Sequence, residues 1–151
     1  MVELREARKT AAKIGLGLQY VLKEARIFDI LTKLSPVLLS KEISAKVTII
    51  CKGGTVLNKV FLKGTQRFSE DIDLDAFFAE KLGRKQKLVF LDKNILSLLR
   101  ESYQIGRPRL MREVARFTCT FTNEMGAKDC VFVEFNLEPK GVRSFEIIEV
   151  R

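Results

Sequence analysis

The chain has 151 residues, of which 46% are hydrophobic and 30% are charged, and its formal net charge is +8; this composition indicates one globular domain with a hydrophobic core and excludes a disordered chain. No apolar run is long enough to span a bilayer, and the first ten residues contain acids but no apolar segment, so we expect a cytoplasmic protein with neither a membrane span nor a secretory signal. The chain has no histidine, which excludes the usual zinc sites and catalysis by Ser-His or Cys-His pairs.

The N-terminal part is expected to be helical. Over residues 3–34, apolar residues such as Ile14, Leu18 and Leu22 recur at helix spacing. Gly15 and Gly17 should divide this stretch into two helices. The following segment LSPVLLSKEISAK, residues 34–46, contains a proline and polar residues, so it predicts a connection with a short helical turn.

The middle of the chain predicts a strand, a helix and a second strand. Val47–Cys51 is β-branched and apolar, and Gly53-Gly54 bounds it, which is typical of a buried strand. A helix is expected after the glycines, ending at Gly64. The next strand, DIDLDAFF at residues 71–78, alternates strictly. One face should carry Ile72, Leu74 and Ala76, and the other should carry Asp71, Asp73 and Asp75.

The C-terminal half predicts one more helix and three strands. Residues 84–103 form an amphipathic pattern with Leu88, Leu91, Ile95 and Leu98 in a core-facing stripe. Residues 113–121 and 130–138 should form a hairpin, and 144–150 a last strand. We therefore expect an α+β fold with a mixed sheet, as a single domain over residues 1–151: a helical lead-in (1–46) and a core of sheet and helices (47–151).

The positive charge is unevenly distributed along the chain. Residues 1–46 hold nine Lys/Arg and five acids, residues 80–117 hold ten and four, and residues 47–79 hold four of each. A basic field around an acidic cluster attracts polyanions such as nucleotides or nucleic acid, although a merely solvated surface explains the excess equally well. The three cysteines, Cys51, Cys119 and Cys130, are odd in number and lie in apolar stretches, so we interpret them as small buried hydrophobic residues.

The three alternating aspartates require an external compensation. At about 3.3 Å per residue, carboxylates at alternate positions stand roughly 6.6 Å apart at their bases, and their tips can converge on one ion. Mg²⁺ is the hard cation that takes carboxylate oxygens together with substrate phosphates. The alternative is a solvent-facing edge strand with three hydrated acids, and alternation alone favours that alternative.

The glycines before the acids favour a phosphate site. A strand that runs into Gly53, Gly54 and Thr55 and then into a helix presents bare backbone N–H groups and a positive helix end to a triphosphate. The spacing does not match the P-loop pattern, because Lys59 follows no second glycine at the required distance. Thr55 would bind a phosphate or simply cap the helix.

Together, the strings KGGTVLNKV and RFSEDIDLD resemble the signature of the AbiEii-like nucleotidyltransferases, which are toxins of abortive-infection toxin–antitoxin systems within the polymerase-beta-like superfamily. The likeness extends over about residues 1–140. It implies a nucleotidyltransferase fold and a third carboxylate on a later strand between apolar residues. Glu134, between Val133 and Phe135, matches that position, and strand parity places it opposite the apolar face; a plain surface glutamate is the alternative.

The resemblance implies two-metal phosphoryl chemistry, in which the side chains of Asp71, Asp73 and Glu134 hold two Mg²⁺ ions. The implied reaction transfers a nucleoside monophosphate from an NTP to an RNA acceptor such as tRNA or to a protein. Glu134 would also help to remove the proton of the attacking hydroxyl. The implied nucleotide-binding residues are Gly53, Gly54, Thr55, Arg67 and Ser69. Arg67 would clamp the triphosphate or form a surface ion pair, and Asp75, Lys52 and Lys59 are weaker candidates.

The resemblance also implies a helical C-terminal part, and the chain ends at Arg151 without one. We therefore expect a minimal form, or a pocket completed by a partner chain; a cognate antitoxin is the expected partner, and pairing with a second copy is left open. The alternative function is a catalytically incomplete relative that binds nucleic acid or a partner through its basic flanks. Metal-dependent phosphodiesterase chemistry on the same acids is a third hypothesis, disfavoured by the lack of histidine ligands.

Overall fold

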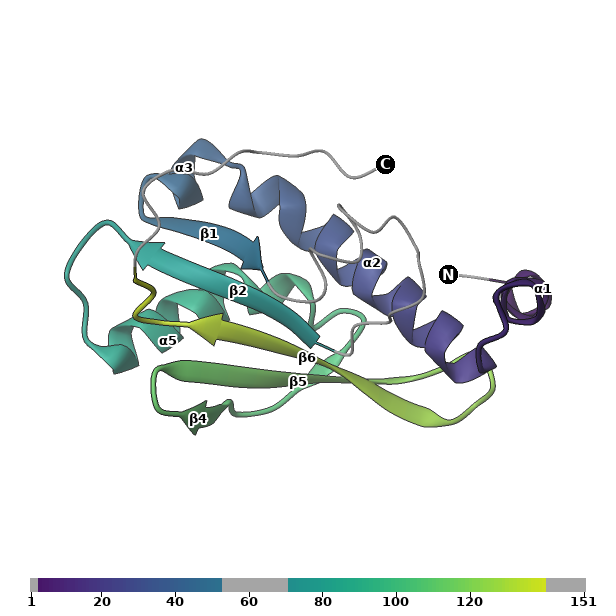
Figure 1. Cartoon of the computed structure of the whole chain (residues 1–151). Coiled ribbons are helices and arrows are strands. Elements are labelled where there is room, and N and C mark those ends of the chain that lie inside the picture. The colour runs from purple at the N-terminus through teal and green to yellow at the C-terminus, as the bar shows by residue number, and fades with distance from the viewer. Residues whose placement is uncertain (1–2, 53–70, 141–151) are drawn as a thin grey trace.

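The computed structural model describes residues 3–52 and 71–140, and Figure 1 shows how its elements follow one another. The predicted helix after the glycines and the predicted strand over 144–150 lie outside the described residues. The helices are α1 (Leu4–Ile14), α2 (Leu18–Leu38), α3 (Lys41–Ser44), α5 (Arg84–Asn94) and the 3₁₀ turn η2 (Leu96–Leu98). The strands are β1 (Val47–Lys52), β2 (Asp71–Phe78), β3 (Gln104–Ile105), β4 (Arg109–Met111), β5 (Val114–Thr122) and β6 (Lys128–Asn136).

The N-terminal helices divide where the glycines predict. Gly15 ends α1 in the left-handed conformation (φ 71°), and its N–H donates to the carbonyl of Ala11. The predicted connection over residues 34–46 is wrong in its first part, because α2 continues through Pro36 to Leu38. Pro36 lies in the last turn, so its missing N–H removes only one helical hydrogen bond. Ser40 then caps α3 by accepting a hydrogen bond from the N–H of Ile43.

The strands form one mixed sheet in the order β1-β2-β6-β5-β3, with β4 also paired to β5. β2 and β6 are parallel and every other pair is antiparallel, which confirms the predicted α+β class with a mixed sheet. The predicted hairpin is confirmed as β5 and β6. In its turn, the side-chain oxygen of Asn123 accepts hydrogen bonds from the N–H groups of Met125 and Ala127.

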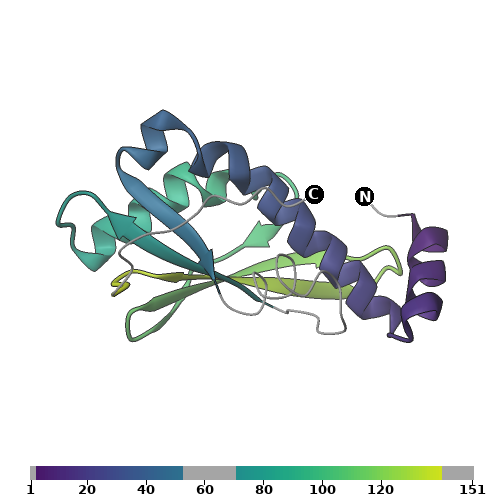
Figure 2. The ribbon, with the colours of Figure 1, turned by 45° about the horizontal axis from the view of Figure 1, so that its top comes forward.

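One face of the sheet builds the core. Figure 2 shows α2, α3 and α5 gathered on one side of the strands, whereas α1 sits at the far end of α2. The residues on the core face are buried as the alternation predicts: Ile72, Leu74, Ala76, Val131, Val133 and Phe135 of the strands, with Leu137 directly after β6. They pack against Ile27, Ile30 and Leu34 of α2 and Leu91 of α5. The described residues include no helix that is long and apolar enough to cross a membrane.

The predicted helix over residues 84–103 is shorter than expected. α5 ends at Asn94 and η2 follows, which changes the phase of the apolar stripe. Leu96 and Leu99, three residues apart as a 3₁₀ turn requires, are fully buried, whereas Leu98 is 37% exposed. The expected place of Leu98 in the stripe is therefore wrong, while that of Leu91 and Ile95 is confirmed.

Candidate active site

On the face of the sheet away from the helices, one charged residue from each of five strands lies in register with the next. Asp73 of β2 is the register partner of Lys52 on β1 and of Glu134 on β6. Glu134 is in turn the partner of Arg116 on β5, which is the partner of Arg109 on β4. Register partners on neighbouring strands point to the same side of a sheet. These five residues, Lys52, Asp73, Glu134, Arg116 and Arg109, form what we call the cross-strand row.

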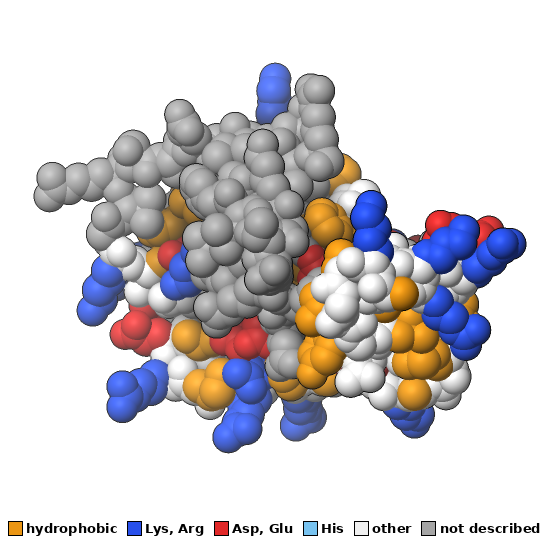
Figure 3. Space-filling view, turned by 45° about the vertical axis from the view of Figure 1, so that its right-hand side comes forward, with side chains coloured by type: hydrophobic (Ala, Val, Ile, Leu, Met, Phe, Trp, Pro, Cys, Tyr) orange, Lys and Arg blue, Asp and Glu red, His pale blue; other side chains and the backbone are white. Residues whose placement is uncertain are grey.

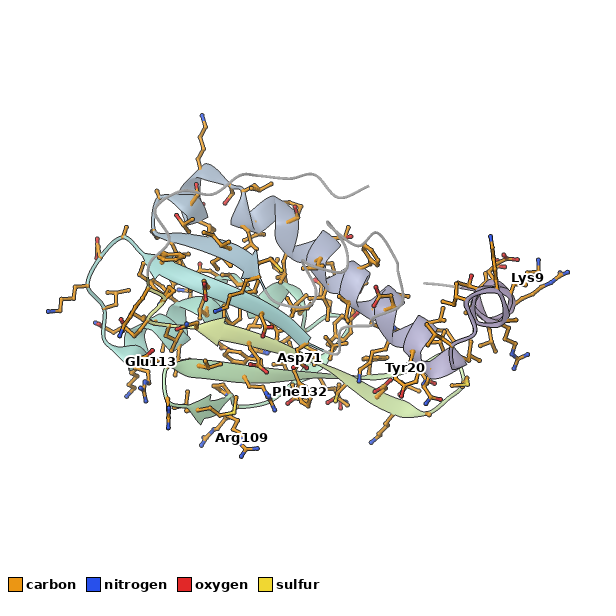
Figure 4. All side chains as sticks on the ribbon, in the orientation of Figure 1. Lys9, Tyr20, Asp71, Arg109, Glu113 and Phe132 are labelled. Carbon is orange, nitrogen blue, oxygen red and sulfur yellow. The ribbon has the colours of Figure 1, made fainter. Side chains whose placement is uncertain are left out.

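The structure thus places Glu134 on the same face as Asp71 and Asp73, although β2 and β6 are far apart in the sequence. Asp71 lies beside Phe132, one step along the same pair of strands. Figure 4 shows these two residues near the centre of the sheet, with Arg109 farther out on β4. The two acid-bearing strands are therefore direct neighbours.

Asp73 is the least compensated acid of the row. Its side chain forms no hydrogen bond or ion pair with any of residues 3–52 or 71–140. Burial raises the pKa of Asp73, and the negative charge of Glu134 raises it further, while Lys52 and Arg116 act in the opposite direction. A half-buried carboxylate beside a like charge is a site that gains from a bound cation.

Glu134 is held by an arginine on the side away from Asp73. Arg116 donates a hydrogen bond from Nε to Oε1 of Glu134 at 2.9 Å, and its Nη2 lies 2.8 Å from the same oxygen as an ion-pair contact. The side chains of Glu134 and Arg116 are 15% and 28% exposed. The guanidinium also lies 4.6 Å from the centre of the Phe132 ring. Because β5 and β2 flank β6 on opposite sides, this ion pair draws the carboxylate away from Asp73.

Asp75 has a partner of its own. Lys52 Nζ lies 2.7 Å from Oδ1 of Asp75, whose residue is only 8% exposed. Asp75 is therefore paired with a residue of β1. Cys51, next to Lys52, faces the core side; burial, together with the charge of Asp73, raises the pKa of its thiol to about 11, so the thiol stays protonated at neutral pH.

The acids suit a divalent cation in type but are not gathered around one point. Within the two described ranges, no three acidic or cysteine side chains stand close enough to hold one metal ion. The expected convergence of carboxylate tips is thus not seen among these residues, and the pairing of Glu134 with Arg116 is the physical reason on the β6 side. The donor set itself, carboxylate oxygens with a half-buried acid at Asp73, fits the hard cations Mg²⁺ and Mn²⁺.

The predicted nucleotide-binding residues, Gly53, Gly54, Thr55, Arg67 and Ser69, lie outside the described residues, as does Lys59. The structure does locate the two points where their segment joins the sheet. β1 ends at Lys52, and β2 begins at Asp71. Lys52 pairs with Asp73, so both attachment points lie at the cross-strand row. Figure 3 shows acidic side chains next to basic ones around the residues drawn in grey.

Arg116 is the member of the candidate site that the sequence analysis did not single out. It is the sole charged residue of β5, in the string VARFTCTFT, and such a charge in an apolar strand is itself a signal. Linking it to Glu134 requires the register of the β5–β6 hairpin, which pairs the two residues.

Comparisons with known proteins identify the family of the chain. The family described as "Nucleotidyl transferase AbiEii toxin, Type IV TA system" matches residues 42–142, about two thirds of the chain. No curated protein matches the sequence. Among solved structures, the crystal structure of JHP933 from Helicobacter pylori is 21% identical with a TM-score of 0.41. That match covers 72% of this chain and 44% of the other, so the chain spans less than half of that protein. From the extent of the family match, the chain belongs to the AbiEii nucleotidyl transferase toxin family.

Proposed function

We propose that this protein is a metal-dependent nucleotidyltransferase that moves a nucleoside monophosphate from an NTP to a hydroxyl of an acceptor, with RNA such as tRNA as the first choice and protein as the second. The observation that carries the proposal is the register pairing of Asp73 with Glu134, which sets two carboxylates side by side on one face, where burial and the charge of Glu134 raise the pKa of Asp73. Membership of the family supports this chemistry.

The metal would be held by Asp71, Asp73 and Glu134. Two Mg²⁺ ions, when bound, supply charge neutralisation of the phosphates and a lower pKa of the acceptor hydroxyl. Asp71 and Asp73 lie on one strand, and Glu134 lies on its parallel neighbour as the register partner of Asp73. Lys52 holds Asp75 and keeps a positive charge at the end of β1.

In the proposed reaction, the acceptor oxygen forms a bond to the α-phosphorus while the bond from the α-phosphorus to the bridging oxygen breaks. Pyrophosphate leaves with that electron pair, and Glu134 takes the proton of the attacking hydroxyl. Gly53, Gly54 and Thr55 would bind the β- and γ-phosphates through backbone N–H groups and the threonine hydroxyl. Arg67 and Ser69 would bind the same triphosphate.

The family implies a cognate antitoxin as the protein partner, because its members belong to type IV toxin–antitoxin systems.

Transfer of label tests the proposal directly. The whole chain is incubated with Mg²⁺, total tRNA or protein, and each of the four NTPs labelled at the α-phosphate. We expect label on one acceptor class from one preferred NTP. Asp73→Asn and Glu134→Gln should each reduce the rate by at least about 100-fold, the usual loss when a group that acts in the transition state is removed.

A matched control uses an acid of the same sheet that lies outside the row. Glu113, exposed in the turn between β4 and β5, is changed to Gln and should leave transfer unchanged. Undiminished transfer by Asp73→Asn would refute the proposed site. No transfer by the wild-type chain, with no Mn²⁺ binding, would refute the proposed function.

A second candidate is a nucleic-acid-binding module without catalysis. The observation in its favour is the run of arginines around β4, namely Arg107, Arg109 and Arg112, which continues the row on the side away from the acids. RNA binding that weakens steeply with salt but ignores both Mg²⁺ and Asp73→Asn would support this candidate over the enzyme.

A further inference from the structure

Arg116 occupies a position that affects the proposed site. In the structure it neutralises Glu134, which is one of the two carboxylates that stand beside each other in the row. A divalent cation shared between Asp73 and Glu134 would need the Glu134 carboxylate that Arg116 now contacts. Arg116 and the cation thus have one ligand in common.

We propose that Arg116 competes with the divalent cation for Glu134, so that the metal-free chain holds its third acid turned away from Asp73 until a cation displaces the guanidinium. This inference rests on the proposed function and deepens it, because it makes Arg116 a positioning residue that sets the metal concentration at which the site assembles.

The bonding pattern makes displacement feasible. Both nitrogens of Arg116 bind one oxygen, Oε1, so this ion pair leaves Oε2 of Glu134 unengaged by Arg116. A cation can therefore bind Oε2 first, and the carboxylate can then rotate away from Arg116. The pair is partly exposed, and an ion pair of that kind shifts an equilibrium by only about fivefold.

The guanidinium also has a second contact that does not depend on Glu134. It lies over the ring of Phe132, with 4.6 Å between the guanidinium carbon and the ring centre. A cation–π contact of this kind persists after the carboxylate leaves. Arg116 therefore would remain at the site face once released, where its charge is available to a phosphate.

The experiment measures Mn²⁺ affinity of the whole chain by the loss of the free-ion EPR signal, without nucleotide or acceptor. The variants are Arg116→Met and Arg116→Lys. We expect Arg116→Met to bind Mn²⁺ about fivefold more tightly than wild type, because the competitor is gone. Arg116→Lys keeps the charge but loses the two-nitrogen contact and should lie between the two.

Arg109→Met is the matched control. Arg109 is the cross-strand partner of Arg116 on the same face, is exposed, and forms no ion pair with any described residue. Competition for Glu134 predicts less than about a twofold change for Arg109→Met, whereas a general field effect would tighten Mn²⁺ binding in that variant as well. In a Glu134→Gln background, Arg116→Met should have no effect, since the shared ligand is absent.

The outcomes separate this inference from the proposed function. Mn²⁺ binding that Asp73→Asn abolishes but Arg116→Met leaves unchanged or weakens would overturn the competition and keep the metal site. Mn²⁺ binding that is absent from wild type and from both Arg116 variants would overturn both. Melting temperatures with and without Mn²⁺ add a second readout. If Arg116 has only a structural role, Arg116→Met should melt below wild type by the same amount in both conditions. If Arg116 competes with the cation, Mn²⁺ should raise the melting temperature of Arg116→Met more than that of wild type.

Discussion

Asp73→Asn should stabilise the metal-free protein at neutral pH, although it removes a charged residue from the centre of the sheet. The pKa of Asp73 is raised by burial and by Glu134, so the folded chain binds the Asp73 proton more readily than the unfolded chain does. Ionisation of this group therefore destabilises the fold as the pH rises above about 3.9, the ordinary aspartate pKa, and the full loss is reached above the raised folded pKa.

The magnitude follows from the strand pairing. Neighbouring strands lie about 4.8 Å apart, and two unit charges about 5 Å apart repel by roughly 0.8 kcal/mol in bulk water and about 3 kcal/mol at an effective dielectric of 20. Lys52 and Arg116 offset part of this repulsion. We therefore expect a gain of about 1 kcal/mol at pH 7, or a rise in Tm of about 3 °C for a chain of this size.

The assay is thermal unfolding in EDTA at pH 7 and at about pH 3, where the difference between Asp73→Asn and wild type should vanish. Asp75→Asn is the matched control, because it makes the same change two residues along the same strand and face. Asp75 is paired to Lys52 at 2.7 Å, so its replacement should lower stability by about 1 kcal/mol. Equal or lower stability of Asp73→Asn at pH 7, or a gain of similar size for Asp75→Asn, would refute the electrostatic reasoning.

Substitutions at three further positions test the scaffold by denaturant unfolding. Phe117 is fully buried and packs edge-on against Phe135, with 5.9 Å between the ring centres. Phe117→Ala should therefore lower the free energy of unfolding by about 3–5 kcal/mol, and a loss under about 1 kcal/mol would contradict this packing. Lys87 is 6% exposed and donates a hydrogen bond to the carbonyl of Leu137 at 2.8 Å. Lys87→Met leaves that carbonyl without its donor and should lower the free energy of unfolding by about 1–3 kcal/mol. An unchanged midpoint of denaturant unfolding would count against the bond. Gly15 has a φ of 71° and open space around it, so Gly15→Ala should lower the free energy of unfolding by about 1 kcal/mol through backbone strain alone. Gly15→Asn should be closer to wild type in stability. Equal free energies of unfolding for the two variants would exclude backbone strain as the cause.

The faces of the long strands could be predicted from the sequence, because side chains alternate with period two whatever the sheet around them. Ile72 and Leu74 are buried and Asp73 lies on the other face for that reason. The same rule correctly set Glu134 opposite Val133. Since both strands expose their acids on the face away from the helices, their pairing suffices to bring Asp73 and Glu134 together.

Other features depend on geometry that a single-residue pattern does not contain. The 3₁₀ turn η2 has fewer residues per turn than the α-helix α5, so side chains after Asn94 point in other directions than a continued α-helix would give. Leu96 and Leu99 therefore lie in the core, and Leu98 does not. The contact of Arg116 with Glu134 depends on the hairpin register, and a slip of one residue would put the arginine on the core face. The short strands β3 and β4 have too few residues for any period to be recognised.

The parallel pairing of β2 with β6 also affects when the cross-strand row forms in a newly made chain. β5 and β6 join through a tight local turn, but β6 reaches β2 only after the whole stretch between Phe78 and Lys128 has closed on itself. Contacts over such separations form late, since the entropy of loop closure must be overcome before they are gained. A nascent chain in which β6 has not yet paired with β2 therefore has Asp73 and Glu134 apart, so the cross-strand row can form only after β6 has been synthesised.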